Sequence, residues 1–531
     1  MKQSYFAGTG KLIRLFLRRD RFILPVWILL PVMLVAGQVS FVGAMADWQK
    51  FLGELSGNPL TSALLGPIVP LSREGAVLWR GMLQSAIAIM IGSAFTVIRH
   101  TRTEEESGRS ELILGCAVGR HAYLTAALVF SCMGSLIAGL LVSALLIGSG
   151  FSAVGSLLAG LTIAASGWLF AGIGGLGAQL REHAGSARGF VFSVYMATFV
   201  LMVMNHVGGG STGWAWLVPQ SWFRITLPFR DNNLWPLLIF AILSLVPVIS
   251  AYSLSARRDL RAGLFEQKPG AAEGSPGLNS PLALAWRQHK STVWGWTIGM
   301  IFLGGSFGFI TPNISDNISE MLVGMNSWAA AMARQGNREG FMAASIYMTG
   351  LMVGMSVYGI ITVLKLKKEE TEHFAEMVLA RPVSRAKWMS SYLVMAFAGS
   401  SFILFMLGVG AGLGWSIASG DMTLLFRTLG MSLSKIPSAW IIIGIAALLY
   451  GWLPQVASIL SWTFIGLFII VEMLWEAGVV GWSAMKLTPF AYAHYSIPVN
   501  ELPLFPLLGL LILATVLTGV GLIGFKRRSI G

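Results

Sequence analysis

The chain has 531 residues, of which 55% are hydrophobic and only 11% are charged, and its mean hydropathy is +0.70. This composition excludes a water-soluble globular protein, because so little polar surface cannot cover so much apolar surface. The formal net charge of +13 does not require nucleic acid as a partner, since basic residues beside membrane helices face anionic lipid headgroups. We therefore predict an all-α polytopic membrane protein surrounded by a lipid bilayer.

Twelve continuous apolar runs are long enough to cross a bilayer, which takes roughly 20 residues in a helix. They do not alternate in polarity and are about twice as long as a barrel strand, so helices are expected. Six of the runs come first, at 22–44, 77–98, 122–147, 153–177, 188–207 and 234–253. Six more follow, at 292–312, 343–364, 388–415, 436–453, 455–475 and 502–524. Most of the 37 Lys and Arg residues fall on the side that holds both termini, and the positive-inside rule makes that side cytoplasmic.

The sequence also repeats itself once, at a nearly constant offset. Arg18 to Trp27 is matched by Arg287 to Trp296, and Arg257-Arg258 by Arg527-Arg528. Such distant matches predict two tandem halves of six helices. Six crossings return the chain to its starting side, so we expect the halves to be related by a pseudo-twofold axis along the membrane normal. The predicted organisation is a first half, a Gly- and Pro-rich cytoplasmic linker and a second half, at residues 1–261, 262–281 and 282–531.

A charged segment interrupts the apolar pattern at matching places in the two halves. The first charged loop, residues 99–123, reads RHTRTEEESGRSELILGCAVGRHAY, and the second, residues 364–388, reads LKLKKEETEHFAEMVLARPVSRAKW. Each runs from basic through acidic and apolar to basic residues, as expected of an amphipathic helix on the membrane surface. The apolar turn within each loop favours a docking surface for a cytoplasmic partner over a merely solvated loop.

The residues expected to contact this partner are the matched acidic, apolar and basic positions of the two loops. They are Glu104, Glu105, Glu111, Leu112, Leu114 and Arg120 in the first charged loop, and Glu369, Glu370, Glu376, Met377 and Arg385 in the second.

Two stripes of large, adaptable side chains are candidates for a substrate cavity between the halves. Such stripes are usually core packing, but Met and aromatic side chains also suit varied apolar ligands. The candidate cavity residues are Phe192, Tyr195, Phe199 and Met202 on the fifth predicted helix, and Met348, Met352 and Met355 on the eighth.

Motifs for chemistry within the chain itself are missing from the sequence. It contains no G-x-x-x-x-G-K-[ST] phosphate loop and no soluble segment long enough for a nucleotide-binding fold, so we expect no ATP hydrolysis by this chain alone. We also predict no catalytic residue, no cofactor and no metal site, because the seven His are scattered and none lies near Asp or Glu inside the membrane. For Glu472, an acidic residue in the eleventh predicted helix, helix packing is favoured over a proton relay.

At the charged loops the chain resembles a known family. The pattern E-E-x-x-G-R-x-E-L-[IV]-L-x-x-x-V-x-R, the R-R-D-L ending at Arg257 to Leu260 and the two six-helix halves resemble ABC-type antibiotic exporter permeases of the tetronasin and polyketide-export kind. The second charged loop departs from the pattern, with His373 and Phe374 in place of Gly108 and Arg109.

The resemblance implies a permease without its own ATPase site, in a bacterial cytoplasmic membrane and with both termini cytoplasmic. Two copies of a separate soluble ABC ATPase, which holds ATP and Mg, would drive hydrophobic or amphipathic compounds such as antibiotics out of the cell by alternating access. One alternative is an ion-coupled twelve-helix drug exporter, which the scarcity of charges in the crossings disfavours. Another is a membrane component that transports nothing.

Overall fold

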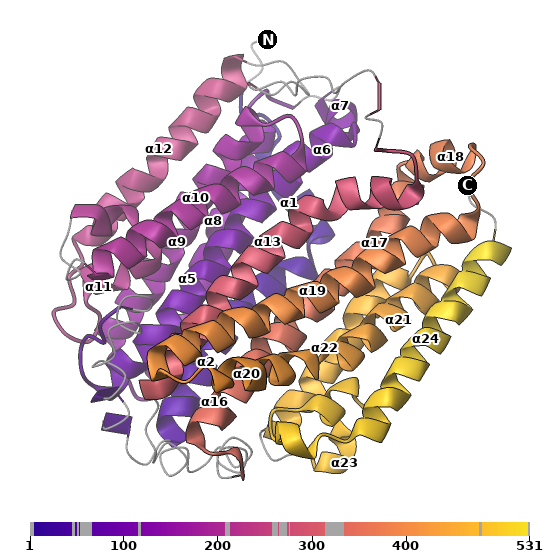
Figure 1. Cartoon of the computed structure of the whole chain (residues 1–531). Coiled ribbons are helices and arrows are strands. Elements are labelled where there is room, and N and C mark those ends of the chain that lie inside the picture. Colours follow the sequence, from indigo (N-terminus) through magenta and orange to yellow (C-terminus); the bar gives the residue numbers. More distant parts are fainter. Residues whose placement is uncertain are drawn as a thin grey trace. The chain divides into compact units, whose positions relative to one another are not determined.

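The structure, a computed structural model, describes residues 5–44, 48–49, 52–53, 66–114, 118–207, 213–257, 264, 273–274, 277–313, 334–476 and 480–528. Within these ranges the chain is helical and forms no β-strand. Twelve helices of the described chain are long and apolar enough to cross a membrane (Figure 1). The predicted all-α polytopic fold is therefore confirmed.

By its internal contacts the chain divides into two compact units, Met1–Gly270 and Ala271–Gly531. In Figure 1 the first unit runs from indigo to magenta and the second continues to yellow. The division falls within the segment predicted as a linker, most of which lies outside the described residues. A pseudo-twofold relation between the two units stays a prediction.

The first unit is built around α9 (Ala153–Leu180), which packs against α5, α8 and α12. Glycine permits the closest of these approaches, since a Cβ on Gly160 would lie 2.1 Å from the carbonyl oxygen of Gly139. Small residues of this kind let membrane helices approach closely enough to pack backbone on backbone. Its other elements are α1 (Thr9–Arg19), α2 (Ile23–Ala44), α5 (Arg73–His100), α6 (Arg102–Glu106), α7 (Arg109–Leu114), α8 (Ala122–Gly148), α10 (Ala184–Val207), η1 (Gly213–Leu217), η2 (Pro219–Ser221), α11 (Phe223–Thr226) and α12 (Pro236–Arg257).

The second unit has α19 (Arg385–Ser419) as its longest helix, packed against α13 and α20. The side chain of Ser384 begins this helix by accepting a hydrogen bond from the backbone N–H of Lys387 at 3.2 Å, as an N-cap residue does. Its other elements are α13 (Pro281–Ile310), η3 (Thr311–Asn313), α16 (Asn337–Ile346), η4 (Tyr347–Met355), α17 (Ser356–Thr371), α18 (Phe374–Leu379), α20 (Thr423–Leu433), α21 (Ile436–Trp452), α22 (Ala457–Glu476), α23 (Trp482–Met485), η5 (Pro489–Ala493), η6 (Val499–Glu501) and α24 (Leu504–Arg527).

Two crossings of the second unit differ from the sequence prediction. The eighth is a composite, because η4 is a π-helical segment between α16 and α17. The tenth begins well before residue 436, since α20 leads into α21 within one candidate span, Thr423–Trp452. Lys435 and Pro437 lie at this junction. The apolar run in the sequence marked only the part of the crossing that follows this lysine.

Candidate functional site

The two charged loops fold into similar local structures within their own units. In the first loop, α6 turns into α7 through Gly108, whose φ is 72°. In the second, α17 turns into α18 through His373, whose φ is 61°. A positive φ is uncommon for a residue other than glycine. The second loop nevertheless keeps the turn, although His373 stands where the first loop has Gly108. The His373 Nδ1 lies 2.8 Å from a carboxylate oxygen of Glu376.

The acidic part of the first charged loop is tied to its own unit. Glu104, only 3% exposed, accepts a hydrogen bond from Arg19 on α1. Glu105 accepts a 2.6 Å hydrogen bond from Arg102, which is itself buried and also donates to the carbonyl oxygen of Glu182 at 2.6 Å. The side chain of Glu104 is thus buried, whereas docking by charge requires it on the surface.

A second set of buried contacts joins the end of α1 to α5. The carboxylate of Asp20, at the end of α1, lies 2.7 Å from the His100 Nε2 and 3.1 Å from a guanidinium nitrogen of Arg99 at the end of α5. The His100 ring in turn stacks on Phe16 of α1, with 4.0 Å between the ring centroids. These contacts fix α1 against the C-terminal end of α5.

The acidic residues of the second charged loop are also paired internally. Glu369 accepts from the Gln288 side chain on α13 at 3.3 Å. Glu370 accepts from Arg528 at 2.6 Å and from the Tyr450 hydroxyl at 2.9 Å. Gln288 occupies the position that Arg19 has in the first copy of the sequence repeat. Each loop therefore attaches its first glutamate to the matching residue near the start of its own unit.

The basic residues that end the loops cap the last helix of each unit. Arg120 donates to the carbonyl oxygens of Ser255 at 3.2 Å and Ala256 at 2.9 Å, at the end of α12. Arg385 donates to the carbonyl oxygen of Arg528, just after α24, at 2.6 Å. Basic side chains satisfy free carbonyls at helix C-termini in this way. Neither interaction excludes a further contact with a partner, because both arginines are exposed.

The apolar residues of the loops divide between core and surface. Leu112 on α7 is 78% exposed and Met377 on α18 is 66% exposed, while their neighbours Ile113 and Val378 pack against the core. Glu111 and Glu376 are exposed beside them. The side chain of Leu114 lies outside the described residues. The outward faces of α7 and α18 are therefore apolar surfaces of the two loops that a partner can reach.

The candidate cavity stripes are largely packed. Tyr195 and Met202 are buried in core clusters, and Phe199 packs partly against the second of these. Phe192 is exposed in the N-terminal half of α10. Met348 on η4 packs partly against the core of the second unit. The side chains of Met352 and Met355 lie outside the described residues.

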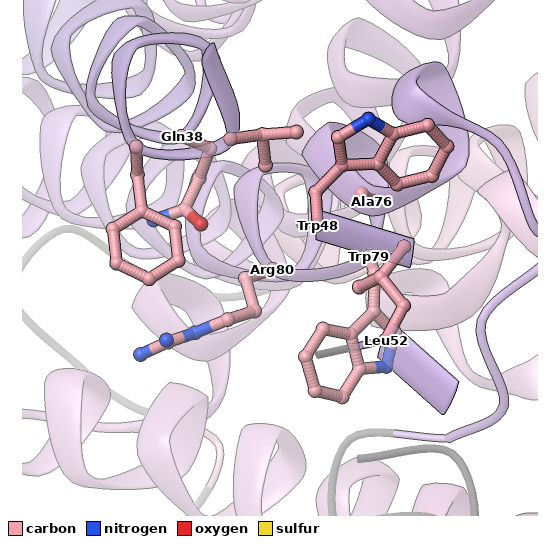
Figure 2. A pocket seen from close by; sticks show the side chains of 8 residues that line it. Gln38, Trp48, Leu52, Ala76, Trp79 and Arg80 are labelled. Carbon is pink, nitrogen blue, oxygen red and sulfur yellow. The ribbon is translucent and has the colours of Figure 1, made fainter. Parts of the chain in front are cut away.

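Sequence reasoning passed over an arginine inside a crossing. Arg80 lies within the candidate span Arg73–Glu106, and its side chain is exposed. It belongs to a small pocket between α2 and the start of α5 (Figure 2). The pocket is lined by Gln38, Phe41, Val42, Trp48, Leu52, Ala76, Trp79 and Arg80. The charge itself was the signal in the sequence, since it interrupts an apolar run.

The second unit also contains a buried charged cluster that the sequence did not reveal. A carboxylate oxygen of Glu472 lies 2.7 Å from the His494 Nε2, and its other oxygen accepts from the Tyr347 hydroxyl at 2.7 Å. Lys435 is buried nearby and donates to the carbonyl oxygen of Ala493. The statement that no His lies near an acid inside the membrane is therefore wrong for Glu472. The pair joins residues 22 positions apart in the sequence, with a turn of helix and two short elements between them.

His494 follows the short helix η5 and lies outside the candidate membrane spans. Burial lowers its pKa, against the opposing effect of the hydrogen bond to Glu472. The ring is enclosed by Tyr347, Trp475 and Tyr495, with centroid distances of 4.7, 4.8 and 4.2 Å. In the described part of the chain no three His, Cys, Asp or Glu residues are placed to hold a metal ion.

Comparison with known proteins assigns the family. Residues 278–526 match the family described as the C-terminal domain of the multidrug efflux system permease Rv1217c. Over 535 residues the chain is 31% identical to the multidrug efflux system permease protein Rv1217c of Mycobacterium tuberculosis, across 99% of this chain and 96% of that protein. The chain, whose described part has twelve helices long and apolar enough to cross a membrane, belongs to the family of multidrug efflux system permeases to which Rv1217c also belongs.

Proposed function

We propose that the chain is the membrane-spanning subunit of an ATP-driven ABC exporter, and that it moves hydrophobic or amphipathic compounds out of the cell by alternating access. Antibiotics of the tetronasin and polyketide kind are the expected substrates. The partner is a soluble ABC ATPase in two copies, which binds ATP and Mg. The membrane is the bacterial cytoplasmic membrane, with both termini of this chain in the cytoplasm. Family membership supports the efflux role.

The observation that carries the ATP-driven part of the proposal is the exposure of Leu112 and Met377 at matched places in the two charged loops. Exposed apolar side chains flanked by exposed glutamates are what an apolar anchor with a charged rim requires at a protein interface. Each anchor lies on a short helix whose other face is held by the core of its unit. A pair of identical soluble subunits would thus find one docking helix in each half.

The buried ion pairs supply a path for the force in the first unit. A push on α7 reaches α6, and α6 is bound to α1 through Glu104 and Arg19. The end of α5 is bound to α1 through Asp20 and His100. Since α5 is one of the most buried helices of the unit, its displacement would alter the packing of its neighbours.

The second unit offers a parallel route. Glu370, just before α18, is bound to Arg528 after α24 and to Tyr450 on α21. The Arg528 guanidinium also lies over the Tyr450 ring, 4.8 Å from its centroid. Movement of α18 would therefore act on two helices that already touch each other.

The experiment replaces one anchor at a time in the full chain, coexpressed with its ATPase. Burial of a leucine side chain contributes about 1.5–3 kcal/mol, so Leu112→Asp should weaken binding of the ATPase roughly ten- to hundredfold. Met377→Asp should act in the same direction. Substrate-stimulated ATP hydrolysis and recovery of the ATPase with the tagged permease are the measurements.

Leu487→Asp is the matched control, because Leu487 is 82% exposed but lies between α23 and η5, away from the charged loops. It should leave both measurements unchanged. Normal hydrolysis and normal recovery of the ATPase in both anchor variants would refute docking through α7 and α18. Charge reversal at Glu104 is not an equivalent test, since it would place a cation against Arg19 and disturb folding.

One observation favours the ion-coupled exporter as a second candidate. Glu472 is a buried acid in a candidate span with a histidine and a tyrosine hydrogen-bonded to it, and such groups serve proton relays in ion-driven transporters. Efflux from membrane vesicles separates the two mechanisms. Collapse of the proton gradient by an ionophore should leave ATP-supported efflux intact, whereas gradient-dependent efflux without ATP would favour the ion-coupled exporter.

A further inference from the structure

Arg80 is a charged residue in a crossing that the coupling mechanism does not use. It lies seven residues, about 10 Å, into α5 by the rise of a helix, and its side chain is exposed. An arginine within a membrane helix is costly and usually marks a path or a binding site for ions or ligands. Its guanidinium makes no ion pair or hydrogen bond with the residues that the structure describes, so the charge is open to a ligand.

The surroundings of Arg80 combine apolar rings with one amide. Phe41, Trp48 and Trp79 contribute aromatic rings to the pocket and Gln38 contributes a carboxamide (Figure 2). The Trp79 Nε1 donates to the carbonyl oxygen of Gly66 at 2.7 Å, which fixes the ring and satisfies its only donor. The wall next to the guanidinium is therefore apolar and preorganised.

The size of the pocket limits what it can accept. The empty space among its lining residues is about 280 Å³, and this figure includes space that is open to the outside. It can therefore hold one end of a compound but cannot enclose the whole. With a guanidinium and a carboxamide at this end, the part that fits is a small group that accepts hydrogen bonds.

Charge selects among such groups. A guanidinium presents planar paired donors that match a carboxylate or a similar oxyanion, and its charge repels an ammonium group. The low-dielectric surroundings strengthen both effects relative to water. The only carboxylate on the same part of α5 is that of Glu74, six residues earlier and about 9 Å along the helix.

We propose that Arg80 and Gln38 form a subsite for the acidic group of an anionic, amphipathic efflux substrate, with the rings of Phe41 and Trp79 against its apolar body. The inference rests on the proposed function in taking the chain as an exporter. It adds the substrate class, a carboxylate or comparable oxyanion attached to an apolar body. A phospholipid headgroup presents the same chemistry, so the test separates the two sources.

The test compares a fluorescent apolar carboxylic acid with its methyl ester, which differs only in the negative charge. In cells that carry the complete transporter, Arg80→Gln should reduce efflux of the acid at least tenfold and change efflux of the ester less than twofold. Arg80→Lys should retain part of the acid transport, because it keeps the charge but loses the paired donors. The control is Arg73→Gln, an exposed arginine on the same helix that does not line the pocket, and it should transport both compounds normally.

Equilibrium binding of the same two compounds to the full chain in nanodiscs tests the subsite without the ATPase. In phosphatidylcholine nanodiscs the acid should bind to the unaltered chain at least tenfold more tightly than to Arg80→Gln, and addition of phosphatidylglycerol should weaken this difference only slightly. Equal affinities of the acid for both chains would overturn the proposal. So would a preference for phosphatidylglycerol that depends on Arg80 while binding of the acid does not. If the unaltered transporter exported neither compound in the presence of ATP, that result would instead count against the proposed function.

Discussion

Removal of the Glu472 carboxylate should destabilise the second unit more than any surface substitution. Its two oxygens accept from Tyr347 on η4 and from His494 after η5, both at 2.7 Å. All three side chains are buried, and so is Lys435 beside them. In Glu472→Ala the tyrosine and the histidine lose their acceptor.

The magnitude follows from the burial of the group. In Glu472→Ala two buried donors, the Tyr347 hydroxyl and the His494 ring N–H, are left without an acceptor, which costs about 1–3 kcal/mol for each. Glu472→Gln keeps the volume and one acceptor, so it should lose only the charged part of the hydrogen bonds, about 1–3 kcal/mol. Tyr347→Phe in the Glu472→Gln background should be less than additive, because both changes remove one interaction.

The assay is unfolding of the full chain in detergent micelles, followed by tryptophan fluorescence. Trp475 and Trp482 lie 4.8 and 5.4 Å from the His494 ring, so they report on the cluster directly. The control is Glu501→Ala, which removes the exposed pair with Arg334 and should cost at most about 1 kcal/mol. If Glu472→Ala unfolded with the same midpoint as Glu501→Ala, the carboxylate would not hold these elements together.

Two further predictions concern packing and pH. Gly160→Ala should sharply reduce the yield of folded protein, because its Cβ would lie 2.1 Å from the carbonyl oxygen of Gly139, whereas Gly189→Ala, with no atom within 4 Å, should leave yield and unfolding unchanged. Burial lowers the pKa of His494. As the pH falls, the unfolded chain therefore binds a proton at this residue near pH 6.5, whereas the folded chain does not. Stability should therefore be constant above that pH and fall as the pH is lowered through it. In unfolding measured between pH 5 and 8, His494→Gln should make stability depend less on pH. If the dependence of stability on pH did not change in this variant, other titratable groups would be its cause.

The sequence alone determined the class of the protein and the position of its crossings. A run of about 20 apolar residues is a local property, and the bilayer makes a helix of it wherever it occurs. The charged loops were equally local signals, and each contains a turn, at Gly108 or His373, that leads into a short helix, α7 or α18. Sequence erred where a helix extends past its apolar run, as α20 does before Lys435.

Only the tertiary structure decided which loop residues a partner can reach. Glu104 and Glu111 are both acidic residues of the first charged loop, yet the first is buried against Arg19, which lies 85 residues away in the sequence, and the second is exposed. The same holds for Glu472, whose partners come from distant elements. Contacts of this kind depend on how helices meet, and spacing within one helix does not encode them.

The candidate cavity residues on α10 show most clearly why the sequence could not tell what lies against a helix face. Phe192, Tyr195, Phe199 and Met202 share a face of α10 by their spacing, but Met202 is buried in the core while Phe192 is exposed. In water, an apolar face must be covered by protein. In a membrane, lipid covers an apolar face as well as protein does, so periodicity identifies the face, and only the packed structure tells what lies against it.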